Sequence, residues 1–102
     1  MDNEATREIQ KIDRLIHEPA RLAIMSVLYA LSEADFLYLL SATGLSKGNL
    51  SAHVGKLEEA GYVEVEKKFI GKKPKTVYRL TPEGRKSFNE YLKKMRKIVE
   101  SV

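Results

Sequence analysis

Hydrophobic side chains recur every three or four residues in the first third of the chain, which is the spacing of one helix face. The first such stretch predicts a helix over residues 4–16, with an apolar face formed by Ile9, Ile12 and Ile16. Pro19 suits the first turn of a second helix, where its missing N–H is not needed. This helix, over residues 19–31, is apolar nearly all round, so we expect it in the core.

Glycine residues punctuate the middle of the chain. A short helix predicted over residues 37–43 ends at Gly44, because glycine commonly closes a helix in the left-handed conformation. Two residues later, Ser46 is a good N-cap for a helix over residues 46–60, which stops before Gly61. The sequence therefore predicts two helices joined by a tight turn.

The polarity pattern then changes to the alternation that is typical of strands. Residues 62–66 and 76–80 alternate in polarity and are rich in β-prone side chains. A loop that contains glycine and proline, over residues 70–74, lies between them. These segments predict a β-hairpin, and residues 34–36 predict a further short strand.

A last helix is predicted over residues 82–99, because Thr81 is a suitable N-cap and a proline follows at the first helical position. The expected fold is mainly α with a small β-hairpin (α+β): a winged helix-turn-helix with N- and C-terminal dimerisation helices. We expect a single domain over residues 1–102, divided into an N-terminal helix (1–18), the helix-turn-helix and wing (19–81) and a C-terminal helix (82–102).

Composition narrows the possible function classes. The 102 residues suffice for one domain with a modest core, and none of them is cysteine. Disulfides, cysteine nucleophiles and thiolate zinc sites are therefore excluded, and no metal or cofactor is expected. The acidic N-terminus lacks the apolar run of a signal peptide, and no apolar stretch is long enough to span a bilayer. We therefore expect a cytoplasmic protein that does not contact membranes.

The net charge of +4 is unevenly distributed. Five lysines and no acid surround the predicted hairpin tip: Lys67, Lys68, Lys72, Lys73 and Lys75. A localised positive patch is typical of proteins that bind polyanions, although a like-charged block also occurs as a solvated loop. In a winged helix this tip lies on the sugar–phosphate backbone, so the candidate contacts are Lys68, Lys72, Lys73, Lys75 and Arg79. The neighbouring Phe69 and Ile70 are expected to pack within the protein rather than insert into DNA.

The helix over residues 46–60 has an anchoring face and a narrow face. Leu50, Val54 and Leu57 share one side and are expected to attach it to the core. The opposite side carries small residues, which would let the helix backbone enter the major groove of DNA. The candidate DNA contacts on this helix are Ser46, Lys47, Gly48, Asn49, Ser51, Ala52, His53 and Lys56.

Some of these residues have a competing structural role. Asn49 follows Ser46 by three residues, so Asn49 or Ser51 could cap the helix instead of contacting a base. His53 lies at the boundary of the buried face, and the other histidine, His17, is far away in sequence. We therefore expect His53 to pack or to touch a phosphate, rather than to bind metal or act as a catalytic base.

Three segments together resemble known regulators. Residues 45–63, LSKGNLSAHVGKLEEAGYV, resemble the recognition-helix signature of MarR- and ArsR-type winged-helix proteins. Residues 78–85, YRLTPEGR, resemble the junction between the wing and the last helix of MarR-like proteins. Residues 19–25, PARLAIM, look like the start of the preceding helix. The resemblance implies a compact archaeal or bacterial repressor or activator that binds DNA as a homodimer.

The chain also departs from these families. It is shorter than typical MarR proteins, so their helical dimerisation region is reduced to one helix at each end, and the ArsR metal ligands are missing. A small-molecule effector pocket of the MarR kind would lie near Ile16, Tyr29, Tyr91 and Met95. Such an effector is compatible with the pattern, but nothing in the pattern demands it.

The terminal helices carry more apolar side chains than one small domain readily covers. They either pack only on their own core or form a two-fold dimer that buries the surplus. In a dimer, the two recognition helices would lie roughly 34 Å apart, which is one turn of DNA. The candidate dimerisation residues are Ile9, Ile12, Ile16, Phe88, Tyr91, Leu92, Met95, Ile98 and Val99.

The sequence predicts a homodimeric transcriptional regulator that binds double-stranded DNA sequence-specifically and is not an enzyme. No phosphate-binding loop, metal constellation or nucleophile–base pair marks a catalytic site. The alternative is a winged-helix module that binds proteins without reading DNA, although an interaction helix would more often carry large apolar anchors. RNA binding is disfavoured, because the aromatic stacking platform for single-stranded RNA is missing.

Overall fold

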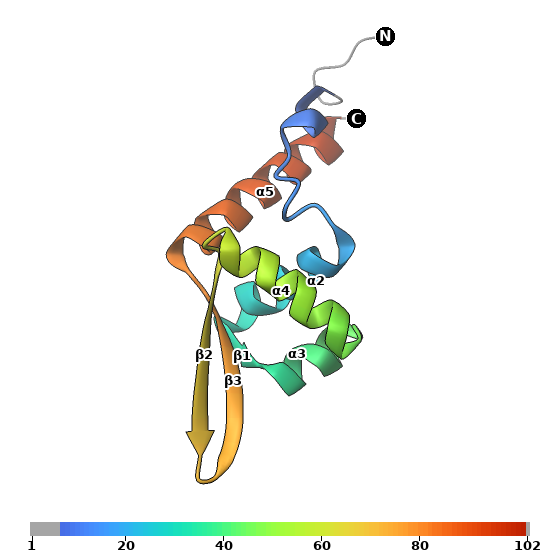
Figure 1. Ribbon diagram of the computed structural model, residues 1–102. Coiled ribbons are helices and arrows are strands. Elements are labelled where there is room, and N and C mark those ends of the chain that lie inside the picture. The colour runs from blue at the N-terminus through green and yellow to red at the C-terminus, as the bar shows by residue number, and fades with distance from the viewer. Residues whose placement is uncertain (1–6, 102) are drawn as a thin grey trace.

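The computed structural model describes residues 7–101. Figure 1 shows a helical body from which a hairpin extends at one end and a long helix at the other. The elements are η1 (Ile9–Lys11), α2 (Pro19–Leu31), β1 (Glu33–Asp35), α3 (Phe36–Thr43), α4 (Lys47–Glu59), β2 (Val63–Ile70), β3 (Lys73–Leu80) and α5 (Pro82–Ser101). The predicted α+β class, a mainly helical winged helix-turn-helix, is confirmed.

Side-chain caps set the start of each described α-helix, which is why the predicted starts lie within a residue of the observed ones. Each capping oxygen accepts a hydrogen bond from a backbone N–H of the first helical turn. The caps are Glu18 for α2, Asp35 for α3, Ser46 for α4 and Thr81 for α5. Gly44 ends α3 with a φ of 71°, in the left-handed conformation that the sequence predicted.

Within the described residues, the predicted helix over residues 4–16 is correct as far as Lys11 and wrong after it. The helix ends with η1 at Lys11, and the chain then runs through turns toward α2. Asp13 explains the break, because its Oδ1 accepts backbone hydrogen bonds from the residues two and three positions later, at 2.9 and 3.3 Å. Ile12 and Ile16 are nevertheless buried in the core. The part of the prediction before residue 7 lies outside the described residues.

The sheet is antiparallel, with β3 between β1 and β2. The predicted loop over residues 70–74 is too long, because β2 and β3 continue until Ile70 pairs with Lys73. The turn is therefore only two residues long, and Gly71 supplies the positive φ of 63° that it requires. Pro74 is tolerated inside β3 because β1 covers β3 only between Val77 and Arg79, which leaves the edge free beside Pro74.

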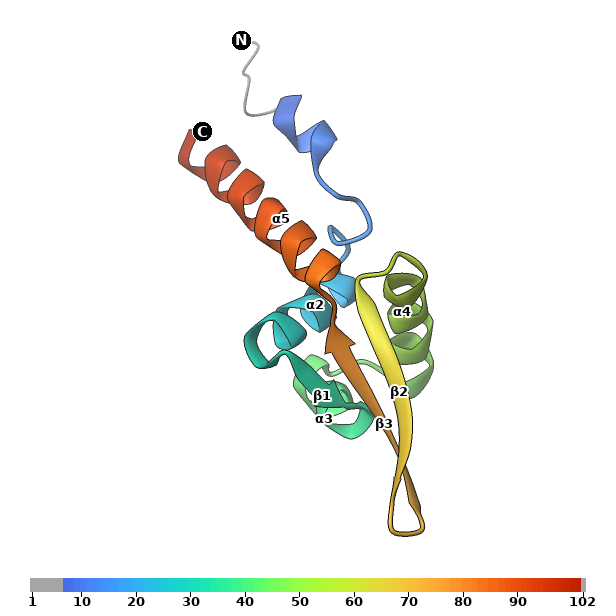
Figure 2. The same cartoon turned by 90° about the vertical axis from the view of Figure 1, so that its left-hand side faces the viewer.

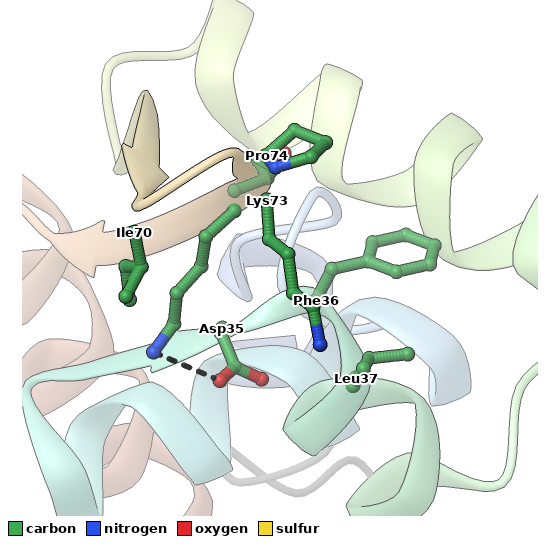
Figure 3. A pocket seen from close by; sticks show the side chains of 8 residues that line it. Asp35, Phe36, Leu37, Ile70, Lys73 and Pro74 are labelled. Atoms are coloured by element: carbon green, nitrogen blue, oxygen red, sulfur yellow. Dashed lines mark ion pairs between the residues drawn. The ribbon is translucent and has the colours of Figure 1, made fainter.

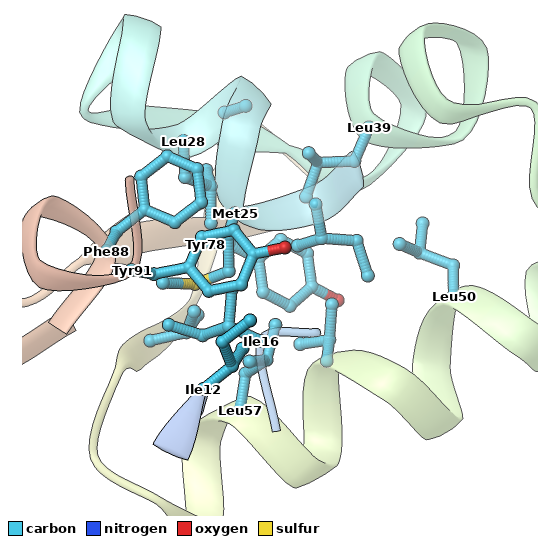
Figure 4. Packing of buried hydrophobic residues seen from close by; sticks show 14 of the residues in the cluster. Ile12, Ile16, Met25, Leu28, Leu39, Leu50, Leu57, Tyr78, Phe88 and Tyr91 are labelled. Carbon is cyan, nitrogen blue, oxygen red and sulfur yellow. The ribbon is translucent and has the colours of Figure 1, made fainter. Parts of the chain in front are cut away.

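A single hydrophobic cluster joins the helices to one face of the sheet, and α2 lies at its centre. Ile24, Met25 and Leu28 of α2 have no exposed surface. Figure 4 shows side chains of the N-terminal segment and of α3, α4, β3 and α5 converging on Met25 and Leu28. Within the described residues, no helix has the length and apolar character needed to cross a bilayer.

The end of α4, the base of the wing and the start of α5 meet at one backbone junction. The Tyr62 carbonyl accepts the Thr81 N–H at 3.0 Å, and the Gly61 carbonyl accepts the Thr81 hydroxyl at 2.6 Å. Gly84 lies directly against Tyr62: a Cβ built there would be 2.2 Å from the Tyr62 carbonyl oxygen. Only glycine therefore allows α5 to approach the wing this closely.

We predict that Gly84→Ala lowers the free energy of unfolding by about 1–3 kcal/mol or more, because the added methyl group must displace backbone. Gly55→Ala is the matched control, because the same addition in α4 meets no atom within 4 Å. The control should gain up to about 1 kcal/mol, since alanine favours the helix over glycine. Urea unfolding of both variants measures these changes, and wild-type stability for Gly84→Ala would contradict the packing described.

Candidate nucleic-acid interface

Helix α4 presents a polar surface of small side chains to solvent. Its anchors Leu50, Val54 and Leu57 are buried, as predicted. The structure places the other predicted contact residues on the exposed surface of α4 or at its cap, His53 excepted: Ser46, Lys47, Gly48, Asn49, Ser51, Ala52 and Lys56. One surface thus collects hydrogen-bonding side chains and two lysines.

Two positions on α4 are occupied by glycine although an added methyl group would meet no other part of the described chain. A Cβ at Gly48 or Gly55 would meet no heavy atom within 4 Å, and neither residue has a positive φ. Each glycine nevertheless costs the helix about 1 kcal/mol relative to alanine. What the two glycines provide is unobstructed access to the helix backbone from outside.

The cap of α4 is Ser46 rather than Asn49 or Ser51. The Ser46 hydroxyl oxygen accepts the backbone N–H of Asn49 at 3.2 Å. Asn49 therefore contributes its main chain to the cap, while its side chain lies exposed beside that of Ser51. Both side chains remain placed for contacts outside the chain.

His53 points toward the N-terminus of α2. Its Nδ1 lies 3.1 Å from Nη1 of Arg21 and 3.5 Å from Oε2 of Glu18, and its side chain is 23% exposed. Arginine can only donate, so His53 accepts this hydrogen bond through an unprotonated Nδ1. Of the two roles expected for His53, packing or a phosphate contact, this position corresponds to packing, against Arg21 and Glu18.

Sequence reasoning missed the cluster of Glu18, Arg21 and His53, because the histidine lies 32 residues after the arginine. Backbone N–H groups of the first turn of α2, foremost that of Arg21, hold the pKa of the Glu18 carboxyl below its ordinary value. Burial opposes this shift, and the positive charge of Arg21 reinforces it. The Glu-Pro pair at a predicted helix start was the available signal for the cap itself.

The wing carries its unpaired positive charge near the tip. Lys75 lies 3.5 Å from Asp35, and Lys68 lies 3.9 Å from Glu66, so both have an acidic neighbour. Lys72 in the turn and Lys73 beside it are exposed and form no ion pair with the described part of the chain. Lys68 and Lys75 also stand directly opposite each other across the strands, where like charges repel.

Arg79 is held at the base of the wing. Its guanidinium lies 3.3 Å from the carboxylate of Glu33 and 2.5 Å from that of Glu66. The hydrogen bond and charge of Arg79 lower the pKa of Glu66. The predicted DNA contact of Arg79 would therefore require it to leave two carboxylates, whereas Lys72 and Lys73 have no such partners.

The prediction that Phe69 and Ile70 pack within the protein is wrong. Their side chains are 73% and 58% exposed, respectively. The physical reason is the length of the hairpin, which extends past β1 and the helices so that no core surface lies beneath its tip (Figure 2).

A pocket of about 570 Å³ lies between the wing and the start of α3 (Figure 3). Phe36, Leu37, Ile70 and Pro74 give it apolar walls, and the Lys75–Asp35 ion pair lies at its side. The sequence did not predict this pocket, because it joins segments more than 30 residues apart.

The predicted effector region between the core and the terminal segments is mostly filled. Ile16 and Tyr91 are buried in the core cluster. A cavity of about 170 Å³ lies nearby, with Asp13, Tyr62 and Tyr91 among its lining residues. Ligand pockets commonly measure about 300–1,000 Å³, so this cavity is small for a ligand.

The structure divides the predicted dimerisation residues into two groups. Ile12, Ile16, Phe88, Tyr91 and Ile98 are buried within the chain itself, and Met95 is partly buried. Ile9, Leu92 and Val99 remain exposed, with Leu92 at 38% and Val99 at 68%. Only the second group offers apolar surface to another molecule.

Comparison with known proteins gives consistent matches. Residues 20–99 match the family of winged helix DNA-binding domains. The protein MJ0432 of Methanocaldococcus jannaschii is 37% identical over 79 residues, which cover 78% of this chain and 86% of that protein. The structure of a transcriptional regulator homologue from Pyrococcus horikoshii is 30% identical, with a TM-score of 0.85 and 95% of each chain covered. A MarR-family regulator from Enterococcus faecalis shares the fold, with 23% identity, a TM-score of 0.73 and coverage of 98% of this chain and 87% of that one.

We predict that Glu18→Gln lowers the free energy of unfolding by about 1 kcal/mol near neutral pH, because it removes a charged cap. The pKa of Glu18 is lowered in the fold, so its stabilisation is present above the ordinary value of 4.5 and is lost as the pH falls through the lowered pKa. The difference between variant and wild type should therefore shrink in acid.

Urea unfolding at a series of pH values measures this dependence. Glu59→Gln, at the exposed end of α4, is the control and should change stability by less than about 0.5 kcal/mol at every pH. A difference for Glu18→Gln that stays constant into acid would contradict a charged cap.

Proposed function

Because this chain belongs to the winged helix DNA-binding domain family, we propose that it reads double-stranded DNA sequence-specifically as a homodimer. It is a MarR-like DNA-binding transcriptional regulator and not an enzyme. In the proposed complex, α4 enters the major groove and the wing lies on the phosphate backbone. The whole chain acts as one winged-helix domain, in the cytoplasm.

The open glycines of α4 carry this proposal. A helix that only supported the core would gain stability from alanine at Gly48 and Gly55, because neither site is crowded. A helix that enters the major groove instead benefits from a low outer surface, since its backbone must come close to the bases. Lys47, Asn49 and Ser51 border this surface and have the hydrogen-bonding groups that base edges require.

The wing supplies affinity that does not depend on sequence. Lys72 and Lys73 have no acidic partner among the described residues, so a phosphate would be their first counter-charge. The repulsion between Lys68 and Lys75 would also fall when an anion binds between them. Each neutralised phosphate releases condensed counterions from DNA, which favours binding at low salt.

The exposed apolar residues of the terminal segments support the homodimer. Helix α5 extends past the helical body (Figure 1), and its own chain covers Leu92 and Val99 only in part. A second copy that offers the same surface would bury both residues and Ile9 through a two-fold interface. We therefore assign dimerisation to Ile9, Leu92 and Val99, with Met95 at the edge.

A partner protein that docks beside the wing is the second candidate. The exposed Leu37 and the apolar pocket next to it favour this alternative, because docking surfaces need such anchors. It differs from DNA binding in its salt dependence, since apolar docking releases few counterions.

We predict that the affinity for random-sequence duplex DNA falls steeply as salt rises. Lys72→Ala/Lys73→Ala should reduce the slope of log Kobs against log salt by about 1.8, from roughly 0.9 for each lost phosphate contact. Fluorescence anisotropy titrations at several salt concentrations measure the slope. Lys93→Ala/Lys97→Ala removes the same charge from α5 and should leave the slope nearly unchanged. No binding of the wild-type protein near 50 mM salt, where phosphate contacts are strongest, would exclude the DNA interface and favour the docking alternative.

We predict that Leu92→Glu/Val99→Glu converts a dimer to a monomer, because two buried carboxylates would repel across the two-fold interface. Sedimentation equilibrium measures the mass, and circular dichroism verifies the fold. Leu31→Glu, on another exposed apolar residue, is the control and should stay dimeric. A wild-type protein that sediments as a monomer at micromolar concentration would refute the dimer.

A further inference from the structure

We propose that Phe69 at the tip of the wing acts as an apolar wedge, placing its ring against the bases in the minor groove of bound DNA. The proposal rests on the proposed DNA-binding function and adds a contact that is neither a phosphate contact nor a hydrogen bond to a base edge.

The first argument is exposure. Phe69 is 73% exposed on a hairpin that projects free of the helices (Figure 2). The ring therefore contributes little to the stability of the chain. Phe69 and Pro74 pair across the strands and are both exposed, so together they form a small apolar surface on one face of the tip.

The second argument is the positive charge around the Phe69 ring. Lys67 precedes Phe69 by two residues on the same face of β2, and Lys72 and Lys73 follow across the turn. A ligand that suits this tip must offer anionic groups close to apolar surface. Duplex DNA offers both, with phosphates along the groove rims and stacked bases between them. Minor-groove proteins commonly combine cationic side chains with an apolar wedge that partly unstacks a base step.

The third argument is the shape of the tip. The turn has two residues, and Gly71 has no side chain to widen it. The wedge would be the single side chain of Phe69, because a two-stranded ribbon as a whole suits the wider major groove rather than the roughly 6 Å minor groove. Pro74 stands opposite Phe69 in the register and faces the same side, so its fixed ring stiffens the strand behind the wedge.

Phe69 suits this role better than Ile70. Adjacent strand residues point to opposite faces, so only one of the two can lead into a groove. Ile70 is one of the residues that line the pocket between the wing and α3, whereas Phe69 is not (Figure 3). Phe69 is also the more exposed of the two, and its flat ring can stack on a base.

The natural sequence contains no tryptophan, which allows a direct test. Phe69→Trp introduces a single indole that can be excited separately from tyrosine. With excess random-sequence duplex at low salt, we expect its emission to be quenched and its accessibility to acrylamide to fall. Leu31→Trp, on the exposed end of α2, is the control and should keep its emission and accessibility.

Affinity supplies a second readout. Phe69→Ala should weaken DNA binding roughly 10-fold, the effect of losing one base–aromatic contact, with an unchanged salt slope. Phe69→Leu keeps an apolar wedge and should lose less. Lys72→Ala/Lys73→Ala should instead reduce the slope, which separates the wedge from the phosphate contacts.

The outcomes separate the two proposals. If the wild-type protein fails to bind duplex DNA, the proposed function falls and the wedge falls with it. If the protein binds with the expected salt dependence, but the introduced indole stays fully accessible and Phe69→Ala binds as wild type does, the wedge is refuted. In that case the proposed DNA-binding function remains.

Discussion

The close approach of Gly84 to the Tyr62 carbonyl is the constraint on which the arrangement of this molecule depends. Around it, Thr81 donates its N–H and its hydroxyl proton to the carbonyls of Tyr62 and Gly61. These contacts join the end of α4, both ends of the wing and the start of α5 within a few residues. The junction therefore fixes the position of the candidate recognition helix α4 relative to the wing.

The core explains why the surfaces that face outward are those proposed to be functional. Helix α2 fills the centre, and the N-terminal segment, one face of the sheet, α3, α4 and one face of α5 close around it. A body of this size cannot cover every face of a hairpin and a helix that extend beyond it. Phe69 at one end and Val99 at the other are exposed for this same reason.

Charge is distributed along the wing by pairing rather than by sequence alone. Acids at the sheet base neutralise the nearest cations, so that Arg79 binds Glu33 and Glu66 while Lys75 approaches Asp35. Lys72 and Lys73 at the turn have no such partner among the described residues, which leaves the positive potential concentrated at the tip. The wing tip combines this positive charge with the exposed ring of Phe69, whereas a solvated lysine loop would carry charge alone.

Local signals in the sequence determined the starts of the α-helices, the tight turn after α3, the anchoring face of α4 and the presence of a hairpin, because caps, glycines and periodicity act over a few residues. Tertiary structure decided the rest. Tyr62, 49 residues later in the chain, donates its hydroxyl to Asp13 at the break in the expected first helix. Pairing across the sheet lengthened the hairpin until Phe69 and Ile70 lost any core surface to pack on. Contacts between segments that are distant in sequence brought Arg21 to His53 and placed the carboxylate of Glu66 against Arg79. These outcomes depend on residues tens of positions apart, and no pattern within a short window of sequence records which of them will meet.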